Sequence, residues 1–169
     1  ELKSHKQFQV QSWVPESVVD GHTVISSRRL LKKRPDDVKA IIVVQGVNDG
    51  SPRDSYAATP TPMGGRLLMA LATRNGWSIQ MGDVSTAFLH APIDELVFVR
   101  PPVNLRREGQ LWQLHKALYG LRRAPLLFQE LLAKCLDEWG FTRCVSEPQL
   151  YCDKKTGVLF SVHADDILM

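Results

Sequence analysis

The feature that most constrains the fold is the stretch of residues 80–89, in which an alternating apolar pattern ends at an aspartate. The alternation of apolar and polar residues up to Met81 indicates the end of a half-buried strand. Asp83 stands where this pattern ends, and the hydroxyl side chains of Ser85 and Thr86 could cap a short helix after it. A carboxylate between a strand end and a helix start could hold a metal ion or face a phosphate. The alternative for Asp83, taken alone, is a solvated turn residue.

The C-terminal segment has two more carboxylates between two apolar runs. The β-prone residues 158–162 are followed by Asp165 and Asp166, and then by the apolar residues 167–169. This pattern predicts a tight hairpin with the two aspartates at its tip. Like charges held side by side repel each other, and a divalent cation is the simplest way to keep them there. Asp83 could complete a three-carboxylate Mg²⁺ site of the kind used in two-metal phosphoryl transfer.

A basic hairpin is predicted in the first third of the chain. Residues 30–33 and the β-branched run 38–44 flank a turn at residues 35–37. A loop over residues 46–62, with Asn48-Asp49-Gly50, follows it. The cations form a basic rim or, alternatively, a solvated edge that discourages aggregation. They are Arg28, Arg29, Lys32, Lys33 and Arg34.

Two helices are predicted among further short strands. Thr61 and Pro62 are suited to open a helix that includes residues 66–74 and ends at Gly76, and Pro125 opens a second helix that runs to about Trp139. The β-prone runs are residues 96–99, 111–114, 150–152 and 158–162, with a hairpin turn at residues 154–157. This mixture predicts an α+β fold in which helices cover one face of an antiparallel sheet.

Four short blocks follow one another along the chain: Asp-Val-Ser-Thr-Ala-Phe-Leu-His from Asp83, Val-Phe-Val-Arg-Pro-Pro from Val97, Leu-Tyr-Gly-Leu-Arg-Arg-Ala-Pro from Leu118, and Ala-Asp-Asp from Ala164. In this order they resemble the reverse transcriptase domain of Ty1/copia-type LTR retrotransposons, densely over residues 66–169 and more thinly over residues 23–62. The resemblance implies the fingers and palm of a right-hand polymerase, without a thumb. It implies that residues 1–22 are an N-terminal extension or edge strand, and that residues 23–169 are the fingers–palm fragment, truncated after the Asp-Asp hairpin.

The resemblance implies a catalytic site made of Asp83, Asp165 and Asp166. These carboxylates would hold two Mg²⁺ ions, with Mn²⁺ as an alternative, and the backbone carbonyl of Val84 would be a further metal ligand. Two such ions could activate a primer 3′ hydroxyl and neutralise the phosphates of a nucleotide.

The resemblance also implies nucleotide-binding roles for Phe88, Tyr119, Gly120 and Lys39. Phe88 would be a steric gate, a flat ring in the space that a ribose 2′ hydroxyl needs, and a core phenylalanine is the alternative from the residue alone. Tyr119 and Gly120 would line the nucleotide. Lys39 matches the basic run of the fingers strand, but Ile41 replaces an arginine of that run.

Two further positions bear on nucleic-acid binding. Arg122 and Arg123 would contact the nucleic-acid backbone, a sequence-independent role, with a solvated approach to the helix as the alternative. His163 and Ala164 depart from the family, which usually has an aromatic residue and then valine before the two aspartates.

The implied function is RNA-directed DNA polymerisation from dNTPs on an RNA or DNA template–primer, with integrase and RNase H regions in the same polyprotein. The fragment alone is expected to be inactive or barely active. One alternative is a catalytically dead remnant that at most binds nucleic acid. Another is an α+β interaction domain whose aspartates are incidental.

The composition fits one globular domain. The chain has 169 residues, 44% hydrophobic and 23% charged, and its formal net charge of +3 permits a nucleic-acid partner without requiring one. Its three cysteines lack metal-site spacing, which predicts buried or free thiols in a reducing compartment. There is no bilayer-length apolar run and no signal-peptide pattern. We therefore expect an intracellular protein, cytoplasmic and particle-associated or nuclear, that is neither secreted nor membrane-bound.

Overall fold

The computed structural model describes residues 2–19, 21–33, 35, 38–46 and 54–169. The predicted basic residue Arg34, the turn residues Asp36 and Asp37 and the loop motif at Asn48 lie outside these ranges. The chain divides into two compact units. The first is formed by Glu1–Ser55 and Phe88–Phe128, and the second by Tyr56–Ala87 and Gln129–Met169.

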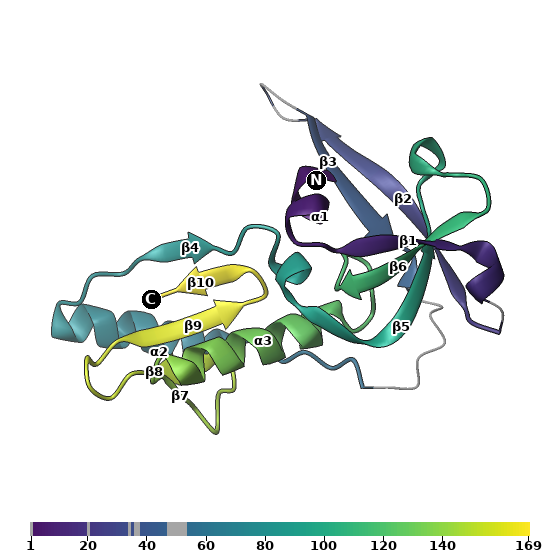
Figure 1. The fold of residues 1–169 in the computed structure, drawn as a ribbon. Helices are drawn as coiled ribbons and strands as arrows, with labels where there is room; N and C mark the ends of the chain where they lie inside the picture. Colours follow the sequence, from purple (N-terminus) through teal and green to yellow (C-terminus); the bar gives the residue numbers. More distant parts are fainter. Residues whose placement is uncertain (1, 20, 34, 36–37, 47–53) are drawn as a thin grey trace. The chain divides into compact units, whose positions relative to one another are not determined.

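The first unit contains a five-stranded sheet with the order β1-β6-β5-β2-β3 (Figure 1). Neighbouring strands are antiparallel except β2 and β5, which run parallel where Val24 lies opposite Phe98. The predicted antiparallel arrangement therefore holds in this sheet except between β2 and β5, where the long segment between β3 and β5 lets the chain return in the same direction. The strands are β1 Gln11–Pro15, β2 Val24–Lys33, β3 Val38–Val44, β5 Pro92–Arg100 and β6 Gln110–Lys116.

The β2–β3 hairpin confirms the predicted basic hairpin, with pairing from Ser27 opposite Val44 to Lys33 opposite Val38. One cluster of the core of this unit consists of Val19, Phe98 and Leu111. A short helix, α1 Leu2–Gln7, precedes β1 and was not predicted. The remaining short elements are the 3₁₀ helices Glu16–Val19, Ala87–His90 and Val103–Leu105.

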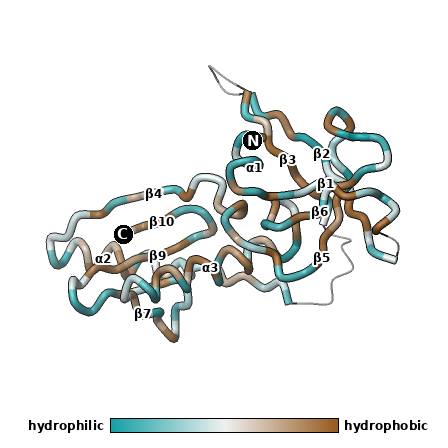
Figure 2. The backbone as a smooth tube through the Cα atoms, viewed as in Figure 1, coloured by the Kyte–Doolittle hydropathy of each residue, from teal (hydrophilic) through white to brown (hydrophobic). Residues whose placement is uncertain are grey.

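The second unit contains a fully antiparallel sheet with the order β4-β10-β9-β8-β7. The predicted hairpin at the C-terminus is confirmed, since β9 and β10 are joined by a tight turn. β9, with the sequence Leu-Phe-Ser-Val-His, is coloured as largely hydrophobic in Figure 2. The strands are β4 Met81–Asp83, β7 Thr142–Arg143, β8 Leu150–Cys152, β9 Leu159–His163 and β10 Asp166–Leu168.

The two predicted helices are present. Helix α2, Pro62–Asn75, begins after Thr61, whose hydroxyl accepts a hydrogen bond from the Gly64 N–H at 3.1 Å, and ends at Gly76 in the left-handed conformation. Helix α3, Ala124–Glu138, begins in the first unit, and its later part packs in the second unit, where Leu136 contacts the β8 and β9 core. Within the described ranges, no helix combines the length and the hydropathy needed to cross a membrane.

Candidate active site

Two of the predicted aspartates face each other across neighbouring strands of the second unit. Asp83 ends β4, Asp166 begins β10, and the two are register partners. The adjacent pair is hydrogen-bonded, because the Val84 N–H donates to the Asp165 carbonyl at 2.8 Å. Hydrogen-bonded and non-hydrogen-bonded pairs alternate in an antiparallel ladder. Asp83 and Asp166 therefore form a non-hydrogen-bonded pair, the arrangement in which side chains come closest.

Asp165 lies beside this pair in the turn between β9 and β10. The turn consists of Ala164 and Asp165, because His163 and Asp166 are the last register partners of the hairpin. Ala164 has a φ of 55°, the positive value that the first residue of such a two-residue turn requires. The bond from Val84 ties this turn to the end of β4. The four predicted metal-site residues thus lie together at one end of one sheet.

The donors at this end are the oxygens that Mg²⁺ prefers, carboxylates and a backbone carbonyl. Asp83 and Asp166 are exposed and Asp165 is half-buried. Over the described part of the chain, no three carboxylate, imidazole or thiol side chains are placed to hold an ion as they stand. Like charges directly opposite each other destabilise a strand pair, and a cation would remove that repulsion. The donor set fits Mg²⁺ chemically, and an ion bound there would require the side chains to turn toward it.

His163 belongs to the same row as the aspartate pair. It is the register partner of Asp166, which is the partner of Asp83, so an exposed imidazole and two carboxylates share one face across β9, β10 and β4. From the sequence, His163 stands out only as a departure from the pattern of the family that the chain resembles. His163 lies in this row because the hairpin turn has two residues, which pairs His163 with Asp166. The short polar segment between the two apolar runs could have indicated such a turn.

Phe88 and Tyr119 contact each other in the first unit. Their ring centroids are 4.9 Å apart with the planes inclined by 63°, and the Phe128 ring lies 6.2 Å from that of Phe88. Both Phe88 and Tyr119 are half-buried. Phe88 is therefore packed among aromatic rings while part of its surface stays accessible, which is compatible with both the gate and the core alternative.

Gly120 is fixed by its close approach to the end of β3. Its φ is 90°, and a Cβ added there would lie 2.0 Å from the carbonyl oxygen of Val44. Backbone hydrogen bonds close the contact, from the Val44 N–H to the Tyr119 carbonyl at 2.8 Å and from the Gly46 N–H to the Gly120 carbonyl at 3.1 Å. Gly120 therefore has a packing role, whatever its part in nucleotide binding.

Lys39 lies on the outer half of the β2–β3 hairpin. It is opposite Lys32, and Ile41 is opposite Leu30. Because side chains alternate along a strand, Lys39 and Ile41 share a face with Arg28, Leu30 and Lys32 of β2. The face that has isoleucine in place of arginine at position 41 therefore still carries the exposed cations Arg28, Lys32 and Lys39.

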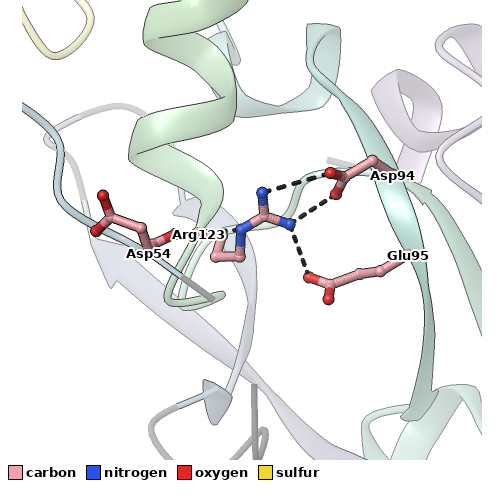
Figure 3. Close-up of polar contacts among 4 residues, drawn as sticks. All are labelled: Asp54, Asp94, Glu95 and Arg123. Carbon is pink, nitrogen blue, oxygen red and sulfur yellow. Dashed lines mark hydrogen bonds and ion pairs between the residues drawn. The ribbon is translucent and has the colours of Figure 1, made fainter. Parts of the chain in front are cut away.

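The arginines before α3 have different surroundings. Arg122 is exposed, whereas the Arg123 side chain is only 11% exposed. Arg123 Nη1 lies 2.6 Å from Asp94 Oδ1 and 3.2 Å from Glu95 Oε1, and its Nε donates to the Asp54 carbonyl at 3.3 Å (Figure 3). The two carboxylates, above all through the hydrogen bond with Asp94, raise the pKa of the Arg123 guanidinium above its ordinary value.

An irregularity in β5 brings both carboxylates to Arg123. In a regular strand, the adjacent side chains of Asp94 and Glu95 would point to opposite faces. The register of β5 against β6 shifts between Pro92 and Val97, so this part of β5 is irregular and both carboxylates reach Arg123. Arg123 is thus already paired with carboxylates within the protein, and its contact with a nucleic-acid backbone stays a prediction. The same prediction stands for Arg122, which is exposed.

Comparisons with known proteins agree with the order of the motifs. The model of the family described as "Reverse transcriptase (RNA-dependent DNA polymerase)" matches residues 16–169. The chain belongs to this reverse transcriptase family. Its relatives place it with the domains of Ty1/copia-type retrotransposons.

Three relatives illustrate this similarity. The Retrovirus-related Pol polyprotein from transposon RE1 of Arabidopsis thaliana is 33% identical over 140 residues, which are 78% of this chain and 10% of that protein. The Transposon Ty1-DR4 Gag-Pol polyprotein of Saccharomyces cerevisiae is 29% identical over 140 residues, 80% of this chain and 9% of that protein. A transposon Ty5-1 protein of the same yeast is 37% identical over 92 residues, 52% of this chain. The chain therefore spans from 9% to 30% of the length of these relatives.

In this reverse transcriptase domain, Thr86 has an unfavourable backbone conformation close to the aspartates. Its φ is 55°, which is an outlier for a β-branched residue, and its hydroxyl donates to the Ser85 carbonyl at 2.7 Å. The prediction that Thr86 caps the following 3₁₀ helix is wrong, because an N-cap residue is extended and its side chain accepts a hydrogen bond from the helix.

Ala164 suits the hairpin turn better than the valine that the family resemblance led us to expect. A positive φ is tolerated better by alanine than by a β-branched residue. Alanine at this position therefore strains the turn less than valine would.

Proposed function

We propose that the chain is the fingers–palm part of an RNA-directed DNA polymerase that uses a template–primer and dNTPs. The observation that carries this proposal is the register pair Asp83–Asp166 beside Asp165, within a chain of the reverse transcriptase family. The relatives are described as Pol and Gag-Pol polyproteins. We therefore propose that the chain works as one segment of such a polyprotein, together with integrase and RNase H regions.

Asp83, Asp165 and Asp166, with the Val84 carbonyl, would hold two Mg²⁺ ions or Mn²⁺. Bound ions supply charge neutralisation at the phosphates and activation of the primer 3′ hydroxyl. The protein contributes the positions of the ligands. The β4–β10 register sets two carboxylates opposite each other, and the bond between Val84 and Asp165 holds the turn beside them.

The first unit would supply the contacts to nucleotide and template. Phe88, held by the ring of Tyr119, would exclude a ribose 2′ hydroxyl. Lys39 and the cations on its face of the hairpin would neutralise phosphates, which compensates for isoleucine at position 41. Arg122 is the exposed arginine available for a backbone phosphate.

Primer extension on an RNA template with dNTPs and Mg²⁺ tests the proposal, in a version of the chain extended through a thumb, because the fragment alone is expected to be inactive or barely active. Asp83→Asn and Asp165→Asn should each reduce extension by about a hundredfold or more, the loss that a misplacement of about 1 Å can cause. Asp137→Asn, on the exposed surface of α3, is the control with the same charge change and should leave extension unaltered.

Ion binding provides a second readout that does not require turnover. Mn²⁺ bound by the chain is measured by electron paramagnetic resonance in the same variants. We expect binding to be lost in Asp83→Asn and Asp165→Asn and kept in Asp137→Asn. Equal Mn²⁺ binding in all four proteins would contradict the metal site.

The gate is tested separately with Phe88→Ala in the same version of the chain extended through a thumb. The variant should incorporate more ribonucleotide relative to deoxyribonucleotide. An unchanged ratio, with polymerisation preserved, would assign Phe88 to packing alone.

A further inference from the structure

A cavity in the first unit has features of a ligand site and lies among residues that the proposed polymerase function does not use. It has a volume of about 530 Å³ and lies among α1, β1 and β6 and the segment before β6. This volume falls within the range of about 300–1,000 Å³ that is usual for small-molecule sites. Its position among non-catalytic elements makes it a separate candidate site.

The cavity has a wall made of two tryptophans. Trp13 of β1 and Trp112 of β6 are register partners, and their ring centroids lie 5.7 Å apart at an angle of 67°. Trp13 is half-buried, and Trp112 is only 2% exposed. Aromatic side chains at the wall of a pocket are the usual means of holding a planar ring.

The charges around the cavity all have one sign. Among the described residues that line it, the charged side chains are Lys3, Lys6 and Arg107, and there is no carboxylate. All three cations are exposed, and the Arg107 guanidinium lies 4.4 Å above the ring of Trp13. A ligand in this cavity would meet cations beside an aromatic wall, which favours an anion that carries a planar group.

Trp112 provides a further, independent indication. Its Nε1–H is buried and has no hydrogen-bond partner within the described residues. Buried donors in proteins are nearly always satisfied, and an indole nitrogen can only donate. An acceptor from outside the protein, carried by a bound molecule or its water, would satisfy this donor.

We propose that this cavity binds a nucleotide, with the phosphate at Lys3, Lys6 and Arg107 and the base against the half-buried ring of Trp13, beside the Nε1–H of Trp112. The nucleotide is either a free monophosphate or one unit of a single-stranded nucleic acid, since both present a phosphate beside a planar base. The proposal does not rest on polymerase activity, because none of these residues belongs to the proposed catalytic site.

Tryptophan fluorescence reports on the site directly. In a Trp77→Phe/Trp139→Phe background, Trp13 and Trp112 are the remaining tryptophans, and the two substituted residues are exposed side chains of the second unit. The protein is titrated with adenosine monophosphate, with adenosine, and with single-stranded oligoadenylate. We expect saturable quenching by the monophosphate or the oligonucleotide and much weaker quenching by adenosine.

Charge variants link the quenching to this cavity. Lys3→Gln/Lys6→Gln should weaken binding about tenfold, the loss expected for one charge-assisted hydrogen bond. The logarithm of the oligonucleotide binding constant falls linearly with the logarithm of the salt concentration. The variant should make this slope shallower by about 0.7 for each phosphate that it no longer neutralises. Lys154→Gln/Lys155→Gln, two exposed lysines in the second unit, is the matched control and should leave affinity unchanged.

Each outcome decides between the alternatives. If adenosine monophosphate and oligoadenylate both quench, and only the Lys3→Gln/Lys6→Gln variant binds them more weakly, the cavity is a free-nucleotide site. Quenching by the oligonucleotide alone, weakened in the same way, supports a site for one unit of a strand. Absence of saturable quenching, or equal weakening by the control variant, overturns the proposal. A polymerase defect in the aspartate variants with normal quenching here would show that the two sites are independent.

Discussion

Two regions of the molecule contain a residue with positive φ but are held in different ways. They are the loop at residues 118–121 of the first unit and the hairpin tip at residues 163–166 of the second. Gly120, at φ 90°, has no room for a side chain, since a Cβ would lie 2.0 Å from the carbonyl oxygen of Val44. Ala164, at φ 55°, carries a Cβ in an exposed turn. The loop is fixed by backbone packing, and the tip by a short turn and strand register.

The difference indicates where each region tolerates change. The loop contributes stability through contacts that are distant in sequence, and substitutions there should destabilise strongly. The tip carries the aspartates, which repel each other across the strand pair. Substitutions at the tip should therefore alter stability modestly and function greatly.

Gly120→Ala should produce the largest effect on stability. The penalty of about 1–2 kcal/mol for a left-handed residue adds to an overpacking penalty of about 1–3 kcal/mol, so the free energy of unfolding should fall by about 3 kcal/mol. Urea unfolding measures this change. Gly21→Ala is the matched control, because Gly21 has φ 79° with nothing within 4 Å of an added Cβ. Equal losses in the two variants would show that close packing does not distinguish the loop.

Local signals in the sequence predicted the local structure well. The Thr61–Pro62 start and the Gly76 end of α2 were predicted correctly, because capping depends on residues within one turn of the helix. The hairpin tip was predicted in the same way, from two apolar runs around a short polar segment. The aspartate end of the sheet followed from these elements and from the family resemblance.

The parts that were not predicted depend on pairing between distant segments. Nothing near Val24 indicates that β2 runs parallel to β5, and nothing near Arg123 indicates its carboxylate partners on β5. The packing role of Gly120 likewise depends on Val44, which is far away in sequence. Spacing and propensity report on neighbours along the chain, so contacts of this kind require the folded structure.

Ala164 should respond to substitution with changes of opposite sign. Ala164→Gly should raise the free energy of unfolding by up to about 1 kcal/mol, because glycine adopts positive φ without strain. Ala164→Val should lower it by about 1 kcal/mol, since a β-branched residue is disfavoured there. Thermal unfolding of both variants checks the signs. A loss of stability in Ala164→Gly would show that more than the turn conformation holds the tip.

Asp166→Asn should have a smaller effect whose sign depends on Mg²⁺. In chelator, removal of one of two facing charges should stabilise the β4–β10 pair by about 0.2–1 kcal/mol. In saturating Mg²⁺ the wild-type protein gains the free energy of ion binding, so the variant should become the less stable of the two. Melting temperatures with and without Mg²⁺ measure this difference, with Asp137→Asn as the control. The same sign in both conditions would contradict a metal role for the aspartate pair.

The smallest expected effect concerns Asp153, a carboxylate of the same unit that is satisfied locally. Hydrogen bonds from the Thr156 hydroxyl, the largest cause, and from the Lys155 N–H lower the pKa of Asp153 from its ordinary value of 3.8. A carboxyl whose folded pKa is lowered contributes stability that is fully present above its unfolded pKa and is lost as the pH falls through the folded pKa. The stability advantage of the wild-type protein over Asp153→Asn should therefore be constant from neutral pH down to about pH 5 and should shrink below pH 3.8. Melting temperatures of the two proteins between pH 7 and pH 2.5 test this prediction.

Thr156→Ser keeps the hydroxyl donor and should follow the wild-type curve. If the difference between wild type and Asp153→Asn does not change with pH, the turn is held by its backbone conformation, as the hairpin tip is, and not by the charge of its aspartate.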